Sequence, residues 1–329
     1  MWTDALWVVS GLALIIQGGN LFVAAAVRIA KFLRMPRVVV GTTLVSLATT
    51  TPEMVVSVMS GMRGESELAV GNAVGSCLCN VGLILGLTAV MKTVEVHRKA
   101  ILLPLAAMGV CGGVLVAFGI GGLISRAEGW VLIAIGFGYY VYDFSRHWKS
   151  RDPVKVREAT AIEADVIHVG RAWFQTRPGT VVQFLAGAGV VVLGSRLLVD
   201  GAVSLAGGLG VPAMVVGLTV VAVGTSMPEL ITAITSSRNS VSDLAVGNVI
   251  GANIANLTFI VGVAAVFAGV RIEARDQWLN FPALAGMFGL LTWMLVRDPR
   301  LTRREGVWLM VTYGLYLVIV TTVTVVRGV

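Results

Sequence analysis

Ten runs of predominantly apolar residues divide the chain, and each is long enough to cross a lipid bilayer. A helix needs about 20 such residues to span a hydrocarbon core of roughly 30 Å. Only 13% of the residues are charged and the mean hydropathy is +0.86, values typical of membrane proteins. The sequence therefore predicts an all-α polytopic membrane protein with ten transmembrane helices. These spans lie near residues 5–27, 38–60, 68–90, 100–118, 127–145, 180–204, 212–236, 244–268, 279–296 and 305–326.

The basic residues are concentrated in alternate connections between these runs. The net charge of +7 could suggest a nucleic-acid partner, but nineteen of the 25 Lys and Arg residues lie in one set of connections. The positive-inside rule places that set in the cytoplasm and both termini on the outside. We therefore predict a cell (inner) membrane location, with the lipid bilayer and no nucleic acid as partner. The basic connections are 28–37, 92–99, 146–177, 238 and 297–304.

The second prominent feature is an internal repeat. Residues 36–90 align without a gap with residues 212–266, an offset of 176, and 22 of the 55 aligned positions are identical. The stretch ELAVGNAVGS at 67–76 pairs with DLAVGNVIGA at 243–252. Such self-similarity indicates that the sequence arose by an internal duplication.

The position of the two copies predicts their relative orientation. The first copy starts in span two and the second in span seven, so an odd number of spans separates them and the second copy enters the membrane from the opposite side. Inverted repeats of this kind are typical of secondary transporters, whose sites lie near the bilayer midplane. We predict two inverted five-helix halves, at residues 1–145 and 180–329, joined by a basic cytoplasmic linker at 146–179.

Each copy carries a Pro-Glu pair in the middle of an apolar span, at Pro52-Glu53 and Pro228-Glu229. Proline removes a helical hydrogen bond, and the freed carbonyl is tolerated in hydrocarbon only where protein, water or an ion satisfies it. Carboxylate, carbonyl and hydroxyl oxygens are the ligands that hard cations such as Ca²⁺ require. The pattern therefore predicts a cation site at each break. The hydroxyl residues beside the breaks are Thr49, Thr50, Thr51, Thr225 and Ser226.

A second polar pattern follows each Pro-Glu pair. Polar residues recur every fourth position on span three, which places them on one helix face, and polar faces within spans meet a partner or a cavity rather than lipid. We expect spans two, three, seven and eight to form a four-helix core around two carboxylates, with glycines allowing close approach. The two rows are Asn72, Ser76, Asn80 and Asn248, Ala252, Asn256, and the glycines are Gly71, Gly75, Gly247 and Gly251.

Charge counting favours an exchanger over a leak. Two ionised glutamates give an empty site a charge of about −2, and burying even one charge in a bilayer is expensive. One Ca²⁺ would neutralise the site, so the conformational change should be fast only when a cation is bound. The sequence has no Walker-type phosphate loop, and we expect no enzymatic activity and no cofactor, with Ca²⁺ and Na⁺ as transported substrates.

These motifs resemble those of the cation/calcium exchanger superfamily, specifically sodium/calcium exchangers of the prokaryotic type. ATTTPE at 48–53 and GNAVGSCLCN at 71–80 look like its first alpha-repeat. GTSMPE at 224–229 and GNVIGANIAN at 247–256 look like the second. The resemblance covers nearly the whole chain. It implies antiport by alternating access, in which spans one and six slide against the four-helix core.

The resemblance also implies roles for particular residues. Glu53 and Glu229 would bind Ca²⁺ and shape the Na⁺ sites, with backbone or hydroxyl oxygens of Thr49 and Thr225 beside them. Further positions that match ligand or site-lining residues of the family are Thr50, Ser226, Ser76, Asn80, Asn256 and the carbonyls of Ser46 and Ala222.

Three positions depart from the family pattern. Ala252 stands where a serine is usual, Asn256 where many members have aspartate, and Cys77 where asparagine is usual. These departures bring the usual three-sodium stoichiometry into question and leave open an H⁺-coupled or K⁺-dependent exchanger of the same fold. A non-transporting membrane scaffold and a channel are the remaining alternatives. We expect a monomer.

Overall fold

The computed structural model describes most of the chain in two compact units. One unit comprises residues 1–51 and 140–251, and the other comprises residues 52–139 and 252–329. Each unit combines segments from both halves of the sequence. The predicted boundaries at 145 and 180 stay predictions. The described residues are 2–33, 37–50, 53–54, 57, 66–149, 172–208, 226–238, 241–274 and 276–327.

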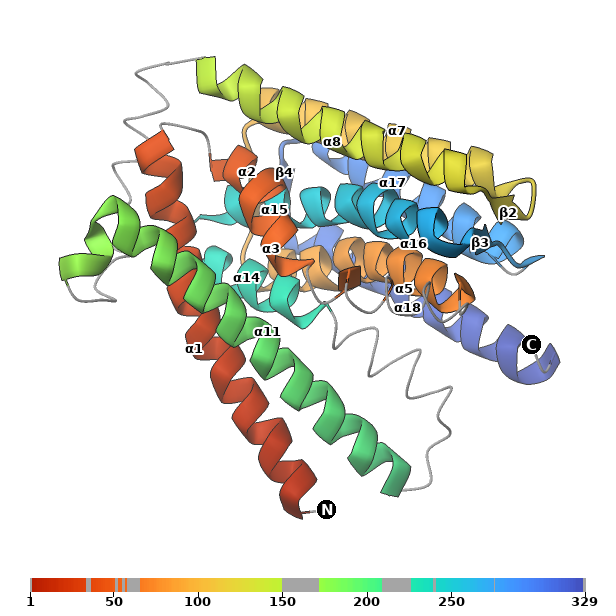
Figure 1. Cartoon of the computed structure of the whole chain (residues 1–329), viewed down its shortest axis with the longest axis horizontal. Helices are drawn as coiled ribbons and strands as arrows, with labels where there is room; N and C mark the ends of the chain where they lie inside the picture. The colour runs from red at the N-terminus through yellow and green to blue at the C-terminus, as the bar shows by residue number, and fades with distance from the viewer. Residues whose placement is uncertain are drawn as a thin grey trace. The chain divides into compact units, whose positions relative to one another are not determined.

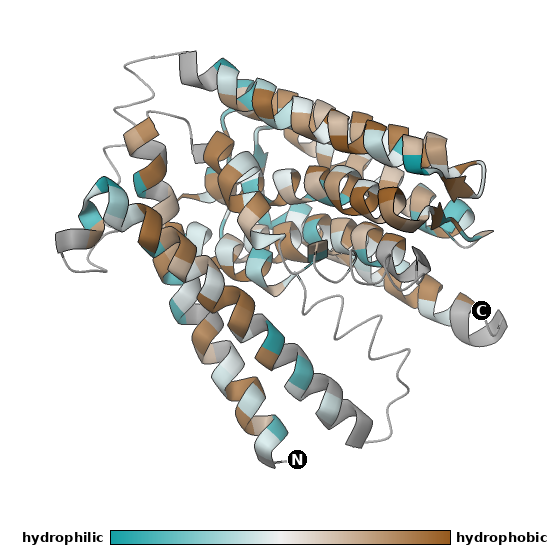
Figure 2. Cartoon of the chain, in the orientation of Figure 1, coloured by the Kyte–Doolittle hydropathy of each residue, from teal (hydrophilic) through white to brown (hydrophobic). Residues whose placement is uncertain are grey.

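Six described helical segments are long and apolar enough to cross a membrane, and each overlaps one of the predicted spans. Apolar residues predominate along these helices (Figure 2). Helices α1 (Trp2–Leu33) and α8 (Arg126–Lys149) cover two more predicted spans. Much of 212–236 and the end of 38–60 lie outside the described residues, so the number ten stays a prediction. The six segments are Val70–Met91, Arg98–Gly119, Arg177–Gly194, Ser242–Ala268, Asp276–Arg297 and Arg303–Val323.

In the first unit, α1 lies beside α11 (Arg177–Gly208) as a long helical pair (Figure 1). The ring of Phe22 packs on that of Phe184 with centroids 4.6 Å apart. The buried Arg28 guanidinium donates a hydrogen bond to the side-chain oxygen of Gln183, and Gln183 donates to the carbonyl of Leu21 at 3.1 Å. Gln183 on α11 therefore binds two groups of α1, the Arg28 side chain and the Leu21 carbonyl, and links the two helices.

Replacing Gln183 by Leu should destabilise this helical pair. The change removes the acceptor of a buried guanidinium, and an unsatisfied buried donor costs about 1–3 kcal/mol, more when it is charged. We expect the unfolding temperature in detergent to fall by about 5 °C. Gln183→Glu keeps an acceptor for Arg28 but loses the amide that donates to the Leu21 carbonyl, so the unfolding temperature should fall by less than in Gln183→Leu. Equal losses in the two variants would show that Arg28 does not depend on this acceptor.

The remaining elements of the first unit are shorter. The chain continues from α2 into a π-helical turn, η1, and then into α3, so the segment around predicted span two is not one regular helix. The shorter elements are α2 (Arg37–Val40), η1 (Gly41–Val45), α3 (Ser46–Thr49), η3 (Ala172–Gln175), α14 (Met227–Arg238) and α15 (Ser242–Ala255). The residues of α15 after Gly251 belong to the second unit.

The second unit consists mainly of helices joined by short connections. Its helical elements are α5 (Ser66–Cys79), η2 (Asn80–Leu85), α6 (Gly86–Met91), α7 (Arg98–Gly119), η5 (Asn256–Ile260), α16 (Val261–Ala268), η6 (Asp276–Asn280), α17 (Phe281–Arg297) and α18 (Arg303–Arg327). Helices α5 and α15 begin 176 residues apart and end 176 residues apart, and each is followed at once by a π-helical turn.

Two short antiparallel strand pairs connect loops of the second unit. Strand β1 (Val94–Glu95) pairs with β4 (Arg300–Leu301), and β2 (Leu123–Ile124) pairs with β3 (Val270–Arg271). Both pairs join a strand from the first part of the sequence to one from the second part. They therefore hold together segments that lie far apart in the chain.

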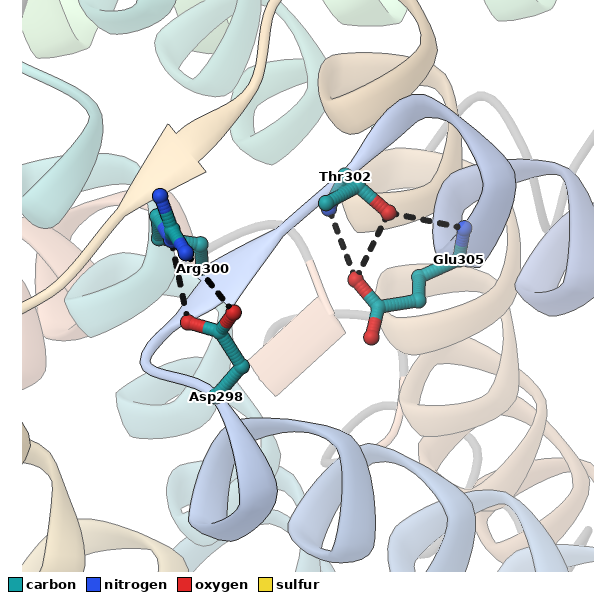
Figure 3. Close-up of polar contacts among 4 residues, drawn as sticks. All are labelled: Asp298, Arg300, Thr302 and Glu305. Carbon is teal, nitrogen blue, oxygen red and sulfur yellow. Dashed lines mark hydrogen bonds and ion pairs between the residues drawn. The ribbon is translucent and has the colours of Figure 1, made fainter.

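Helices α8 and α18 begin with the same capping arrangement. The N–H and hydroxyl of Ser125 both donate to the carboxylate of Glu128 at 2.7 Å. Thr302 donates in the same way to Glu305 at 2.8 and 2.9 Å (Figure 3). This capping box satisfies backbone donors that a helix start leaves free. The two caps fix the ends of helices that occupy corresponding places in the two parts of the sequence.

An exposed ion pair precedes the second cap. Arg300 donates two hydrogen bonds to the carboxylate of Asp298, both at 3.0 Å (Figure 3). These hydrogen bonds lower the pKa of Asp298 from its usual value. The pair orders the connection between α17 and α18, and its contribution to stability should be lost as the pH falls through the lowered pKa of Asp298.

Candidate functional site

The helix of the first Pro-Glu segment ends before the proline. The backbone of Thr50, with φ −79° and ψ 6°, terminates α3. The carbonyl of Ser46 accepts hydrogen bonds from the Thr50 N–H at 2.9 Å and from its hydroxyl at 2.7 Å. Thr49 donates to the side-chain oxygen of Asn248 at 3.1 Å, which joins α3 to α15. Helix α3 therefore ends at Thr50, while Pro52, to which the break was assigned, lies outside the described residues and the break at the proline stays a prediction.

In the second Pro-Glu segment, α14 starts at Met227, so Pro228 lies in the first helical turn, where its missing N–H is not needed. Glu229 follows in the same turn and is fully buried. The positive end of the helix dipole there favours a negative charge. The Thr49 side chain interacts with the carboxylate of Glu229, and neither carboxylate oxygen makes a further hydrogen bond within the described part of the chain. A buried carboxylate in this state requires a cation or a proton.

The second unit presents a set of buried polar groups on α5, η2 and η5. Asn80 donates to the side-chain oxygen of Asn253 at 3.0 Å. Among the described residues, the hydroxyl of Ser76 and the side-chain oxygen of Asn80 have no hydrogen-bond partner, and the Asn256 side chain interacts with the thiol of Cys77. Asn80 and Asn256 begin the two π-helical turns, a local irregularity frequent at functional sites. The Ser76 hydroxyl and the Asn80 oxygen therefore have unused hydrogen-bonding capacity within the described residues.

Asn253 contacts the predicted site residue Asn80 and was not itself predicted from the sequence. Its side-chain oxygen accepts from Asn80, its amide N–H₂ contacts the sulfur of Met108 at 3.6 Å, and its carbonyl accepts from the thiol of Cys77 at 3.7 Å. Asn253 is the counterpart of Cys77 in the internal repeat, 176 residues later. The sequence feature that could have identified Asn253 is that the second copy has asparagine where the first has Cys77.

The structure describes most of the predicted site residues. In the first unit, Ser46, Thr49 and Thr50 are brought together beside Asn248 by the contacts above. Thr225 and Ala222 lie outside the described residues. A ligand role for each residue stays a prediction. The buried ones among them are Ser46, Thr49, Thr50, Ser226 and Glu229 in the first unit, and Glu53, Ser76, Asn80 and Asn256 in the second.

Close approach of α15 to η1 and α2 is confirmed at two of the four predicted glycines. A Cβ atom at Gly251 would lie 2.5 Å from the Ser46 hydroxyl, and one at Gly247 would clash with the backbone of Val38. No described atom lies within 4 Å of the Cβ position at Gly71 or Gly75. The role of these two glycines therefore stays a prediction.

The same contact requires a glycine in η1, which gives a stability test. A Cβ at Gly41 would lie 2.5 Å from the carbonyl oxygen of Leu244, so Gly41→Ala must separate η1 from α15. We expect a loss of about 1–3 kcal/mol, as for other overpacked positions. Gly138→Ala on α8 is the matched control, since no described atom lies within 4 Å of its Cβ position. The control should unfold at the same or a slightly higher temperature, and equal stability of the two variants would contradict the close contact.

Comparison with known proteins assigns the chain to a family. The family described as "Sodium/calcium exchanger protein" matches residues 3–144 and 179–322, which is most of the chain. The chain belongs to this family. The exchanger is 30% identical to the inner membrane protein YrbG of Escherichia coli (strain K12), over 94% of this chain and 97% of YrbG. It is 25% identical to the sodium/calcium exchanger MaX1 of Methanosarcina acetivorans, over 94% of this chain and 96% of MaX1.

A solved structure gives the same result at the level of the fold. The exchanger matches the sodium-calcium exchanger NCX_Mj soaked with 2.5 mM Na⁺ and 1 mM Sr²⁺ with a TM-score of 0.82. The two are 26% identical, and the match covers 96% of this chain and 98% of NCX_Mj. The exchanger is therefore a multi-pass membrane transporter of a cation/Ca²⁺ exchanger family and not an enzyme. The superfamily predicted from the sequence is confirmed.

Proposed function

We propose that the protein exchanges Ca²⁺ for Na⁺ by alternating access. The observation that carries this proposal is the carboxylate of Glu229, which is fully buried on α14 and has the neutral side chain of Thr49 as its interaction partner. Such a group needs a counter-charge, and oxygen-rich surroundings favour a hard cation. Membership of the sodium/calcium exchanger family supports Ca²⁺ and Na⁺ as the ions.

The proposed architecture is ten helices in two inverted five-helix halves, residues 1–145 and 180–329, joined by a cytoplasmic linker. The equal 176-residue spacing of both ends of α5 and α15, with a π-helical turn after each, supports descent from a duplicated unit. The capping boxes of α8 and α18 add a second correspondence. The distribution of basic residues supports placing both termini outside.

In this proposal Glu53 and Glu229 supply the two negative charges that one Ca²⁺ balances. The same site would take Na⁺ when Ca²⁺ has left, because the empty site is costly to move through the bilayer. The neutral oxygen ligands would come from Thr49, Thr50, Thr225, Ser226, Ser76, Asn80, Asn256 and the carbonyls of Ser46 and Ala222.

The second candidate keeps Ca²⁺ and changes the driving ion to H⁺, or makes the exchange K⁺-dependent. Ala252 and Asn256 favour this alternative, because each replaces an oxygen ligand or a charge that the sodium-coupled pattern usually has. Both side chains are fully buried. Fewer oxygen ligands would weaken Na⁺ binding more than the binding of a divalent ion, which the two glutamates attract most strongly.

Transport in proteoliposomes separates these candidates. Purified protein is reconstituted with Na⁺ inside, diluted into Na⁺-free medium with Ca²⁺, and compared with vesicles that have only a pH gradient or only K⁺ inside. We expect Ca²⁺ uptake with the Na⁺ gradient and its loss when a sodium ionophore is added. Uptake that follows the pH gradient and ignores Na⁺ would replace the first candidate with the second. Protein-free vesicles give the leak rate.

A further inference from the structure

Helix α14 carries buried hydroxyl groups beyond Glu229 that neither repeat motif includes. Thr232 and Ser236 are fully buried, and Ser237 is 2% exposed. None of these three hydroxyls has a hydrogen-bond partner within the described residues. The helix therefore presents polar groups in the protein interior whose hydrogen bonds are not made by described protein atoms.

The lack of bonds at these hydroxyls is unusual for this chain. Threonine and serine in a helix commonly donate to the carbonyl four residues earlier. Other helical threonines here do so, with Thr88 donating to Ile84 and Thr258 to Ile254, both at 2.6 Å. Thr232 and Ser236 do not, so their hydroxyls are directed away from the helix backbone. Buried polar atoms without protein partners are generally satisfied by water or by a ligand.

The hydroxyls lie on the same face of α14 as the carboxylate. At about 100° per residue, Glu229, Thr232 and Ser236 fall within an arc of about 60°. With a rise of 1.5 Å per residue, Thr232 lies about 4.5 Å and Ser236 about 10.5 Å from Glu229 along the axis. The row ends two residues before Arg238, which is exposed. It therefore extends from the buried carboxylate toward the end of the helix.

A different face of α14 packs against α1. A Cβ at Gly19 of α1 would lie 2.5 Å from the Ile231 side chain and 3.7 Å from the Thr235 hydroxyl. Ile231 lies about 160° around the helix from Glu229, at the far side from the hydroxyl row. Packing against α1 therefore does not account for the row of hydroxyls. Thr235 is a buried threonine on the side of α14 that packs against α1, so it serves as a control residue.

We propose that Thr232 and Ser236 line a hydrated path by which cations travel between Glu229 and the membrane surface at the Arg238 end of α14. The inference rests on the proposed function in one respect, that Glu229 binds the transported cation. Hydroxyl oxygens at intervals of about 5 Å can replace part of the hydration shell of Na⁺ or Ca²⁺ without holding the ion tightly. By the charge distribution, this end of the helix faces the cytoplasm.

Cysteine labelling tests the path directly. Thr232→Cys, Ser236→Cys and the control Thr235→Cys are made in the full chain, reconstituted in vesicles and exposed to a membrane-impermeant cationic methanethiosulfonate added to one side or the other. The parent chain gives the background from Cys77, Cys79 and Cys111, which are all buried. We expect the first two variants to react from one side at least tenfold faster than Thr235→Cys, and saturating Ca²⁺ to slow the reaction. Reaction at the rate of the control under every ionic condition would overturn the proposal.

Transport by conservative variants provides the second test. The pair Thr232→Val with Ser236→Ala removes both hydroxyls with little change in volume, and Thr235→Val removes one from the packed face. We expect the double variant to lower the Ca²⁺ exchange rate at least fivefold while Ca²⁺ still protects it against thermal unfolding, and Thr235→Val to remain within twofold. A double variant that exchanges at the parent rate would contradict the path.

The two proposals fail in distinguishable ways. Labelling reports access to Glu229 whichever ion drives transport, so Ca²⁺ uptake that ignores Na⁺ removes the proposed coupling and leaves the path intact. Labelling equal to that of Thr235→Cys, together with Na⁺-driven Ca²⁺ uptake by the parent protein, removes the path and leaves the proposed function.

Discussion

Glu229→Gln should reduce Ca²⁺ exchange about 100-fold or more, because it removes one of the two charges that attract the ion. Two unit charges about 4 Å apart attract by about 4 kcal/mol at an effective dielectric of about 20. Each 1.4 kcal/mol of binding free energy changes the affinity about tenfold. The substitution keeps the size of a side chain that is fully buried in the first turn of α14 and removes only its charge. Radiolabelled Ca²⁺ uptake into vesicles and Ca²⁺-dependent thermal protection in detergent measure the two consequences.

Glu305→Gln is the matched control for this change. Glu305 accepts hydrogen bonds from Thr302 at the start of α18, and glutamine can also serve in a capping box. This variant loses the same charge outside the proposed site and should transport at the parent rate. If Glu229→Gln bound and transported Ca²⁺ as well as Glu305→Gln does, the buried carboxylate would be a structural residue and the proposed site would be wrong.

Long sequence patterns predicted elements of the fold, and elements of only a few residues were not predicted. A run of about 20 apolar residues is long enough to identify a helix, and the six described apolar helical segments overlap predicted spans. Strands such as β1 and β4 have two residues each and pair across about 200 positions in the sequence, so no local pattern announces them. The π-helical turns that begin at Asn80 and Asn256 were also not predicted from the sequence.

The candidate site was predictable where the two copies agree. The alignment at an offset of 176 singled out Glu229, because Glu53 occupies the same position in the first copy. It overlooked residues that only one copy has. Thr232 aligns with Val56 and Asn253 with Cys77, so a search for shared residues passes over both. Their polar character became informative only when burial and missing hydrogen bonds were visible.

Asn256→Asp should make the stability of the protein depend strongly on cations. Asn256 is fully buried at the start of η5, where its side chain interacts with the neutral thiol of Cys77. A carboxylate there is a buried charge that costs about 3–5 kcal/mol when nothing compensates it. In choline buffer without Na⁺ or Ca²⁺ we expect the unfolding temperature to fall by about 10 °C relative to the parent.

Saturating Ca²⁺ should restore most of that loss, because a ligand at 100 times its Kd stabilises the state that binds it by about 2.7 kcal/mol. Tryptophan fluorescence during heating in detergent, with and without Ca²⁺ or Na⁺, measures the difference. Asn256→Leu removes the amide without adding charge, so its stability should respond to cations no more than that of the parent. If Asn256→Asp were destabilised equally in both buffers, the added charge would lie beyond the reach of the bound ion. Asn256 would then be a packing residue, and its place among the proposed ligands would be lost while that of Glu229 would stand.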